Sequence, residues 1–447
     1  AIHGKQKINQ NTIYLMIKIL QSKAKNFEKV LNNLLGLRRG YSSKKVTVVK
    51  KIINDVEKYG DKSLIKYEKK FNNLKTLKSN DLTFTKLEIE KNIKFLDRKV
   101  KNSIDLAFSR ILNFHKSQKF NKFKKKDKIN NSFYYRSKPV EKVGVYVPGG
   151  KASYPSSVLM NCIPASIAGV NEIFMTVPSF DGGINPGVLY AAKKCGVKKI
   201  FKLGGAQAIA AFAFGTKVVP KVDKIVGPGN EYVALAKKEV SGISGIDMFA
   251  GPSEVTVVAD KFSKPEWVSA DLIAQSEHDE MSQSILVTNS KDLILKVNKS
   301  IKKQLKFLPK RMIASKSLKN FGLAILLNNL KEAGKVVNII APEHLQIYTK
   351  NPDIFLNSIN NAGSIFLGPY SPEALGDYIA GPNHVLPTSG TAKFSSGLSV
   401  YDFLKRQSVI KISKRGIERL GPSVITLSKY ENLHGHANSV KVRLKKR

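Results

Sequence analysis

Short apolar runs alternate with longer helix-like stretches from Val140 onward, and this alternation constrains the fold more than any other feature of the sequence. Strands are predicted at residues 143–147, 172–177, 199–203, 224–226, 255–259, 285–288, 336–340 and 364–367, with helices such as 206–214 between them. Such alternation is typical of βαβ units around mostly parallel sheets, in which ligands bind at the carboxyl ends of the strands. The predicted fold class is therefore α/β, with two Rossmann-like, incompletely doubly wound domains.

The segments that flank this region are rich in lysine and are predicted to be helical. Residues 17–123 carry apolar side chains at helical spacing, for example Val49, Ile52, Ile53 and Val56. Residues 122–128 are predicted to form an exposed loop, and the last fifty residues, from about Leu398, a basic helical arm. Residues 1–15 are expected to be a leader or an upstream extension without chemistry of their own.

The formal net charge of +41 raises the alternative of a nucleic-acid-binding or membrane-surface protein. The charge is uneven, because residues 1–139 hold 35 basic and 11 acidic residues, whereas the remaining residues carry only +17. Most of the excess is lysine without interleaved aromatic side chains or a recognisable nucleic-acid-binding motif. A solvated basic surface without a specific nucleic-acid partner is the preferred interpretation.

The number of cysteines and the hydropathy of the sequence indicate the cellular compartment in which the protein is expected. The two cysteines, Cys162 and Cys195, show no CxxC spacing and cannot form a disulfide framework, which fits a reducing compartment. No apolar run approaches the roughly 18 residues needed to cross a bilayer. We expect a cytoplasmic protein that does not bind membranes.

A helix predicted from Pro265, capped by Ser263, ends in Gln275-Ser276-Glu277-His278. Gln275 and His278 are three residues apart, so their side chains share one helical face and could converge on one metal ion. This pattern alone is a weak signal, because such a pair is more often a hydrogen-bonded polar face.

Four further motifs place ionisable residues after predicted strands, in Gly/Pro loops or in the arm. They are Ala341-Pro342-Glu343-His344, Pro372-Glu373-Ala374-Leu375-Gly376-Asp377-Tyr378, Gly381-Pro382-Asn383-His384 and Glu431-Asn432-Leu433-His434-Gly435-His436. Functional groups concentrate at such loop positions. The motifs therefore indicate a polar site, and one alternative at this point is a zinc hydrolase with Glu343 as its base.

Together with Gly227-Pro228-Gly229-Asn230, Ala250-Gly251-Pro252-Ser253-Glu254 and Phe394-Ser395-Ser396-Gly397-Leu398-Ser399-Val400, these motifs resemble the histidinol dehydrogenase family. The resemblance covers residues 17–443, with seven blocks in the family's order. It implies two successive NAD-dependent oxidations, of L-histidinol to L-histidinal and then to L-histidine. These are the last steps of histidine biosynthesis.

The resemblance implies one zinc ion per subunit, held by Gln275, His278, Asp377 and His436. A glutamine oxygen is an unusual zinc ligand, because cysteine, histidine and carboxylate side chains dominate such sites. The sequence alone would therefore not have proposed this set. Four protein ligands with room for expansion suit an ion that binds a chelating substrate through its imidazole and amine.

Glu343 and His344 resemble the family's catalytic pair. A neutral imidazole that titrates near pH 6.5 suits removal of the hydroxyl proton, so His344 is the expected general base. Glu343 is expected to activate the water that hydrates the aldehyde. The implied substrate-binding residues are Ser253, Gln275, His278, Glu343, His344, Asp377, Glu431 and His436.

Tyr146, Gln207 and Asn230 are the residues that the resemblance places against NAD. The sequence has no GxGxxG at a strand-to-helix turn, so the usual dinucleotide fingerprint is missing. NAD binding is expected to be loose. Among the other histidines, His115 is expected on a polar helix, His434 has no expected role, and His384 is expected to support a ligand rather than bind the ion.

The resemblance also implies a domain division and a homodimer with shared active sites. An N-terminal extension and helical segment covers residues 1–37. Residues 38–145 and 254–397 are expected to form one discontinuous α/β domain with most metal-binding and catalytic residues, and residues 146–253 an inserted Rossmann-like domain on the NAD side. The arm, residues 398–447, is expected to reach the partner subunit.

Overall fold

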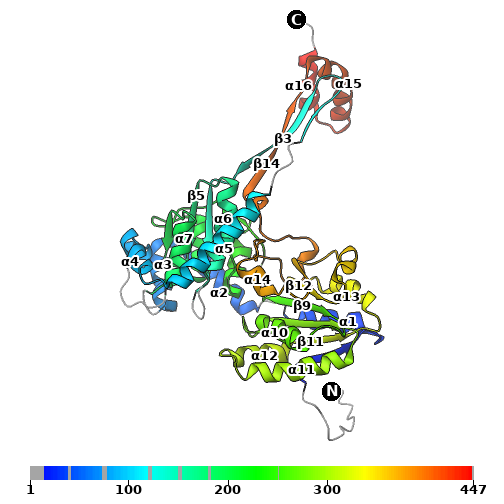
Figure 1. Ribbon diagram of the computed structural model, residues 1–447. Helices are drawn as coiled ribbons and strands as arrows, with labels where there is room; N and C mark the ends of the chain where they lie inside the picture. The colour runs from blue at the N-terminus through cyan, green and yellow to red at the C-terminus, as the bar shows by residue number, and fades with distance from the viewer. Residues whose placement is uncertain are drawn as a thin grey trace.

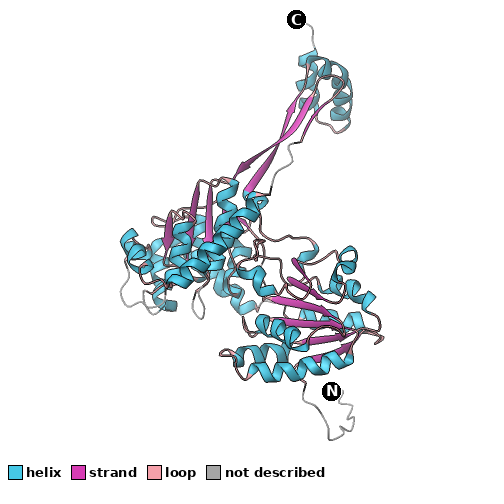
Figure 2. Cartoon of the chain, in the orientation of Figure 1, coloured by secondary structure: helices cyan, strands magenta, loops and turns pink. Residues whose placement is uncertain are grey.

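The computed structural model describes residues 15–38, 42–72, 78–118, 123–149, 154–179, 183–249 and 251–444. It contains two bodies, each with a parallel β-sheet covered by helices, and a slender arm that projects from one of them (Figures 1 and 2). The predicted α/β fold class is confirmed.

The first body is built on a parallel six-stranded sheet with the order β1-β11-β10-β9-β12-β13. Its strands are β1 (Lys18–Gln21), β9 (Glu254–Ala259), β10 (Gln283–Thr288), β11 (Leu323–Leu326), β12 (His344–Tyr348) and β13 (Ser364–Leu367). One apolar core joins the sheet to α10 (Pro265–Ser276), α11 (Lys291–Leu305) and α12 (Arg311–Phe321). A second core joins it to α1 (Phe27–Gly36) and α13 (Ala333–Ile340). The short helix α14 (Glu373–Tyr378) contacts α10.

The second body is built on a parallel five-stranded sheet with the order β6-β5-β4-β7-β8. Its strands are β4 (Lys142–Tyr146), β5 (Glu172–Thr176), β6 (Lys199–Phe201), β7 (Lys224–Val226) and β8 (Gly245–Ile246). One core contains α5 (Arg98–Lys116), α6 (Pro155–Ala168) and α7 (Pro186–Lys194), and α4 (Lys86–Ile93) contacts α7. The other contains α2 (Ser43–Tyr59), α3 (Asp61–Asn72), α8 (Gly205–Phe214) and α9 (Glu231–Val240).

The arm combines a three-stranded antiparallel sheet with a pair of helices. Its strands are β2 (Lys124–Lys126), β3 (Ser132–Pro139) and β14 (Leu404–Lys411), in the order β14-β3-β2, and its helices are α15 (Lys414–Tyr430) and α16 (His434–Leu444). Figure 1 shows the helix pair at the far end of the ribbon, well away from both bodies.

Outside the arm, short 3₁₀ turns occur at Ser79–Leu82, Leu330–Glu332, Pro352–Ser358, Thr391–Lys393 and Val400–Phe403.

Several predictions of secondary structure are wrong. Residues 336–340, predicted as a strand, lie in α13, because a short run of buried apolar residues does not distinguish a strand from a buried helix. Three segments predicted without strands contain β1, β2 and β14. β2 and β14 lack the apolar alternation that predicts a strand, because both are rich in basic residues, lie in the exposed arm and have few buried side chains. Lys264, not Ser263, is the residue that precedes α10.

The segments that pack on each sheet also differ from those that the predicted domain boundaries assign to each domain. Helices α2 to α5 pack on the five-stranded sheet, where Val49, Ile52 and Val56 share a core with Phe212 of α8. The whole of β4 belongs to that sheet, whereas β1 and α1 belong to the six-stranded body. Apolar contacts between segments distant in sequence decide this grouping, and the sequence pattern does not reveal them.

Candidate active site

The predicted catalytic residues lie at the amino end of the six-stranded sheet. His344 is the first residue of β12 and pairs in register with Val255 of β9 and Ser364 of β13. The expectation of residues placed after strands, at their carboxyl ends, is therefore wrong for this motif. The reason is that the apolar run before Glu343 belongs to helix α13, so β12 begins at the motif instead of ending there.

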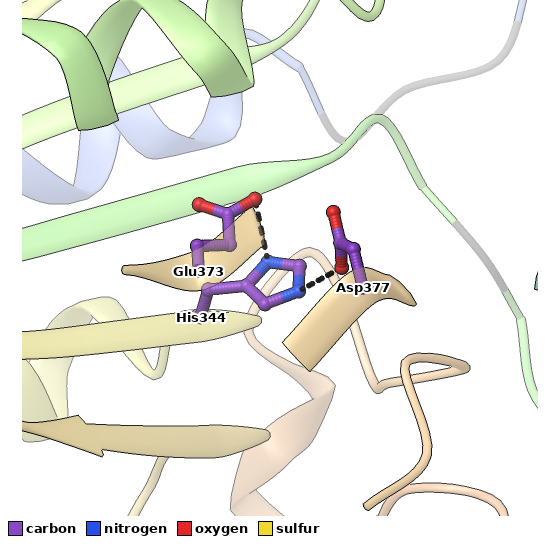
Figure 3. A group of neighbouring side chains, drawn as sticks. All are labelled: His344, Glu373 and Asp377. Atoms are coloured by element: carbon purple, nitrogen blue, oxygen red, sulfur yellow. Dashed lines mark ion pairs between the residues drawn. The ribbon is translucent and has the colours of Figure 1, made fainter. Parts of the chain in front are cut away.

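Three carboxyl groups surround the buried imidazole of His344. Figure 3 shows two of them, those of Glu373 and Asp377, on either side of the ring. Its Nδ1 lies 3.6 Å from Oε1 of Glu373 and 3.7 Å from Oε2 of Glu343, and its Nε2 lies 3.5 Å from Oδ1 of Asp377. Nδ1 also lies 3.1 Å from the carbonyl oxygen of Glu254, an acceptor, so Nδ1 is the protonated nitrogen in this contact. Nε2 is buried and makes no hydrogen bond to the described residues. Nε2, which faces the Asp377 carboxylate, can accept a proton only when the ring is neutral.

The charges around His344 change its protonation. Desolvation opposes the imidazolium, but the carboxylates of Glu373, Glu343 and Asp377 outweigh it and raise the pKa of His344 well above 6.5. This differs from the expected titration near pH 6.5, because the sequence did not reveal three carboxyl groups around one ring. A neutral His344 requires that part of this negative charge be neutralised.

Glu343 is buried beside His344, and desolvation raises its pKa to about 7. Its Oε2 accepts a hydrogen bond of 2.8 Å from the backbone N–H of Glu254, which fixes the carboxyl group at the start of β9. A carboxyl group with this pKa exchanges a proton near neutral pH, as general acid–base chemistry requires.

Arg38 and Glu254, which the sequence analysis did not single out as chemical groups, form the floor of the site. The buried guanidinium of Arg38 lies 2.9 Å from Oε1 of Glu254. It also donates to the carbonyl oxygens of Pro252 and Ser253, at 2.8 and 3.1 Å. These contacts tie Ser253, a predicted substrate residue, to the amino end of β9. No local motif marks Arg38, because its partners are more than two hundred residues away in sequence.

Gln275, at the end of α10, faces Glu373. When the amide is oriented to satisfy its neighbours, its nitrogen donates to the Glu373 carboxylate at 2.5 and 3.3 Å. Asp271, one helical turn earlier, accepts a hydrogen bond of 2.8 Å from Gln346 of β12, and desolvation raises the pKa of Asp271 to about 6. The polar face of α10 therefore points toward β12 and α14.

His278 and His384 complete the surroundings of Asp377. The imidazole of His278 has access to solvent, but protein groups crowd it enough for desolvation to lower its pKa, against the attraction of Asp377. Burial likewise lowers the pKa of His384, whose Nδ1 lies 2.7 Å from the Asp377 carbonyl oxygen. Both histidines therefore favour the neutral form.

A metal ion fits this arrangement. The ligand atoms of His344, Glu373 and Asp377 lie within 4.8 Å of one another, and only Asp377 is shared with the predicted set. Neutral histidines and carboxylates are suitable zinc ligands. Gln275 faces Glu373 and Asp377 lies beside His344, and His278 is near enough for the charges of Asp377 and His344 to act on its pKa.

The remaining predicted site residues of the arm lie elsewhere. Glu431 follows α15 and His436 lies in the first turn of α16, and both side chains are exposed. Figure 1 shows these helices far from α14 and β12. Within one chain, therefore, the arm residues do not join the other predicted ligands.

The residues predicted to contact NAD lie in the five-stranded body. Tyr146 ends β4, and its hydroxyl accepts a hydrogen bond of 3.1 Å from Gly205. Gln207 on α8 is buried and donates to Glu68 at 2.8 Å. Asn230 caps α9 by accepting from the backbone N–H groups of the helix's first turn. Tyr146 lies at the carboxyl end of its strand, and Gln207 and Asn230 lie in or at the start of helices that follow strands, where dinucleotides bind in such folds.

One histidine differs from its expected environment. His115 lies on α5 but is fully buried, whereas a polar helix face was expected. Its Nδ1 lies 3.1 Å from Oε1 of Gln118, and its ring packs edge-on against Phe114. It is a packing residue at the end of α5.

Two parallel α/β sheets with a buried histidine among carboxyl groups define an α/β enzyme. The model of the family described as histidinol dehydrogenase matches residues 38–444. A histidinol dehydrogenase from Pelagibacter ubique (strain HTCC1062) is 53% identical over 97% of this chain and 100% of the relative, and one from Clostridium acetobutylicum is 48% identical over 96% and 99%. The crystal structure of histidinol dehydrogenase from Elizabethkingia anophelis has a TM-score of 0.90 at 37% identity, covering 96% of this chain and 98% of that chain. The chain belongs to the histidinol dehydrogenase family.

Membership confirms the predicted resemblance and activity. The enzyme is an NAD-dependent oxidoreductase that uses histidinol and catalyses the final steps of histidine biosynthesis. Among the described residues, no helix combines the length and apolarity needed to cross a membrane.

Proposed function

We propose that the cluster around His344 carries out both oxidations, of L-histidinol to L-histidinal and of L-histidinal to L-histidine, at one place. The observation that supports this best is the placement of the buried His344 ring, whose Nδ1 lies beside the carbonyl oxygen of Glu254 while its Nε2 faces the Asp377 carboxylate at 3.5 Å. This tautomer leaves one nitrogen able to accept a proton from a substrate hydroxyl. NAD supplies the hydride acceptor for each oxidation.

In the first oxidation, Nε2 of neutral His344 takes the hydroxyl proton while hydride leaves the adjacent carbon for NAD. Glu343 then takes a proton from water as the water oxygen bonds to the aldehyde carbon. Glu343 returns its proton to the former aldehyde oxygen, which gives the hydrated aldehyde, and His344 releases its first proton to solvent. The hydrated aldehyde then offers a hydroxyl proton to His344 as the second hydride leaves for a second NAD, which yields the carboxylic acid. The raised pKa of Glu343, about 7, supports a carboxyl group that both accepts and returns a proton at neutral pH.

We propose that one zinc ion per subunit is held by Gln275, His278, Asp377 and His436. Such an ion orients the substrate and its charge stabilises the developing alkoxide when it is bound. The lowered pKa of His278, due to desolvation, supports the neutral ligand form. Positive charge beside Asp377 also favours the neutral His344 that proton abstraction needs.

Because His436 and Glu431 lie on the distant arm, we propose a homodimer in which each arm completes the partner's site. The arm exposes several large apolar side chains, among them Ile410, Leu427 and Tyr430, and such a surface is suited to being covered by a partner subunit. A hollow of about 550 Å³ between α15, α16 and the residues that follow β14, lined by Ile412, Ile417 and Val424 among others, offers a place for partner side chains. Glu431 would then complement the substrate's imidazole, and Ser253 would lie at the same site.

We further propose that Tyr146, Gln207 and Asn230 border the NAD site and that the enzyme is cytoplasmic. Buried, unpaired Cys162 and Cys195 support the second proposal, because structural disulfides are rare in reducing compartments.

Purified enzyme with histidinol and NAD tests the activity and the metal together. We expect two NADH per histidinol consumed, loss of turnover with a chelator, and its return with zinc. NADH formation that survives complete metal removal would contradict the zinc proposal. Substrate hydrolysis without any need for NAD would contradict the oxidations.

Mixed dimers test the shared site. His344→Asn and His436→Asn chains, each inactive alone, are unfolded and refolded together, so that about half of the dimers are mixed and each mixed dimer has one intact site. Activity is expected to recover to roughly a quarter of wild type. If each arm served its own chain, every site would carry one substitution and the mixture would stay inactive.

A further inference from the structure

Gln275 is an unusual choice for a metal ligand, and its surroundings suggest what makes it suitable. An amide presents an oxygen and an NH₂ group of nearly the same shape, but only the oxygen coordinates a cation. The Gln275 side chain is fully buried at the end of α10. Something must therefore determine which of the two groups faces the ion.

The Glu373 carboxylate makes that choice in the structure. Glu373 begins α14 and is buried, and its two oxygens lie 2.5 and 3.3 Å from the same branch of the Gln275 amide. An ionised carboxylate accepts hydrogen bonds and cannot donate, so beside an ionised Glu373 this branch is the NH₂ group. Desolvation and the neighbouring carboxylates raise the pKa of Glu373 well above its ordinary value, and a cation beside Gln275 and Asp377 would favour its ionised form. The opposite branch then carries the amide oxygen and points away from Glu373.

We propose that Glu373 is a positioning residue that orients the Gln275 amide, so that its oxygen is turned away from Glu373 and available to the ion. The inference rests on the proposed zinc site. It also accounts for glutamine at this position, because a carboxylate at residue 275 would face the Glu373 carboxylate at hydrogen-bond distance. Groups that orient a metal ligand typically contribute 10- to 100-fold to metal affinity.

Zinc affinity, measured by competition with a chromophoric chelator, tests the inference without reference to turnover. Glu373→Met removes the acceptor at similar length and is expected to weaken zinc binding 10- to 100-fold. The same substitution in a Gln275→Ala background is expected to change affinity less than about 3-fold, because Glu373 then has no amide to orient. Glu277→Met, which removes another carboxylate near His278, is the matched control and should also change affinity less than about 3-fold.

Equal losses from Glu373→Met in both backgrounds would overturn the inference, since they would show that Glu373 acts by its charge or as a ligand. If wild-type enzyme binds no zinc, the proposed metal site itself fails, and the two failures are thus distinguishable. Far-UV circular dichroism of each variant checks that the fold is retained.

A swap of the two residues provides a second test that does not depend on Glu373→Met folding. In the Gln275→Glu/Glu373→Gln variant, the new amide can donate to the new carboxylate, and one carboxylate oxygen remains free for the ion. The swap is expected to bind zinc at least tenfold more tightly than Gln275→Glu alone. If Gln275→Glu alone binds zinc as tightly as the swap, the pairing is not required and the inference is wrong.

Discussion

A buried ion pair in the five-stranded body should be essential to the loop that ends at Asn230. Lys237 on α9 pairs with Asp247, and the two side chains are 2% and 1% exposed. Between them they hold both backbone groups of Gly227, since Lys237 donates to its oxygen at 3.0 Å and Asp247 accepts from its nitrogen at 2.8 Å. Gly227 has φ of +112°, and a Cβ there would lie 2.1 Å from the Tyr146 carbonyl oxygen. The ion pair thus holds the loop at Gly227 close to the end of β4.

Lys237→Met is expected to lower the free energy of unfolding by about 3 kcal/mol. Removal of one partner leaves an uncompensated buried charge, which costs about 3–5 kcal/mol. The lower end applies because Asp247 keeps hydrogen bonds from the backbone N–H groups of Gly227 and Met248. Urea unfolding followed by circular dichroism measures the change, and KM for NAD is expected to rise because the Gly227 loop loses one of its two tethers.

Two controls determine whether burial of the charge is the cause. Lys238→Met removes an exposed neighbouring lysine and should change stability by less than about 0.5 kcal/mol. Lys237→Met/Asp247→Asn removes both charges and should be at least about 1 kcal/mol more stable than Lys237→Met alone. If Lys237→Met behaves like Lys238→Met, or if the double variant is less stable than Lys237→Met, the reasoning is refuted.

Three further predictions concern the His344 site. His344→Asn should slow both oxidations, whereas Glu343→Gln should largely spare histidinol and slow oxidation of supplied histidinal by about 10²–10⁴-fold; equal losses on both substrates, measured as NADH formation, would contradict the proposed roles. Asp271→Asn should stabilise the metal-free protein by about 1–3 kcal/mol at about pH 8 and less at about pH 4.5 in urea unfolding. The reason is that desolvation raises the pKa of Asp271 to about 6. Ionisation of Asp271 therefore lowers the stability of the folded protein increasingly from about pH 4 to 6. Equal gains in stability at both pH values would argue against this reasoning. Chelation should stop turnover but leave the circular dichroism spectrum unchanged, and cooperative unfolding on metal removal would instead indicate a structural site.

The sequence predicts β4 to β7, β9, β10 and β13 as strands but misses β1, β8, β11 and β12, and the clearest of the predicted strands are buried and apolar. Every residue of β9 and of β10 is buried, for example, and after Glu254 and Gln283 at their starts both strands continue as apolar or small residues. The same signal misplaced α13, whose residues Val336, Val337 and Ile340 are equally buried. Burial is visible in a sequence, but the choice between helix and strand for a five-residue apolar run is not.

The site was predicted only in part, for a related reason. Glu343 and His344 stand in a recognisable motif, but Arg38, Glu254 and Glu373 contribute through contacts between segments that are far apart in the sequence. Arg38 and Glu254 are 216 residues apart in sequence, so no spacing rule brings them together. The pKa of His344 could not be predicted either, because it depends on three carboxyl groups that only the fold assembles around one ring.

The arm shows why the charge pattern misleads when it is taken alone. Its strands and helices are rich in lysine and arginine, which first suggests a surface for anions, yet the same elements expose Ile410, Leu427 and Tyr430. An isolated arm with this much apolar surface is poorly suited to water, and its tip carries His436 far from the residues with which it would bind an ion. Both observations have one explanation in the proposed homodimer, in which the apolar side chains pack on the partner and His436 enters the partner's site. The basic residues then need only keep the outer face of the arm hydrated.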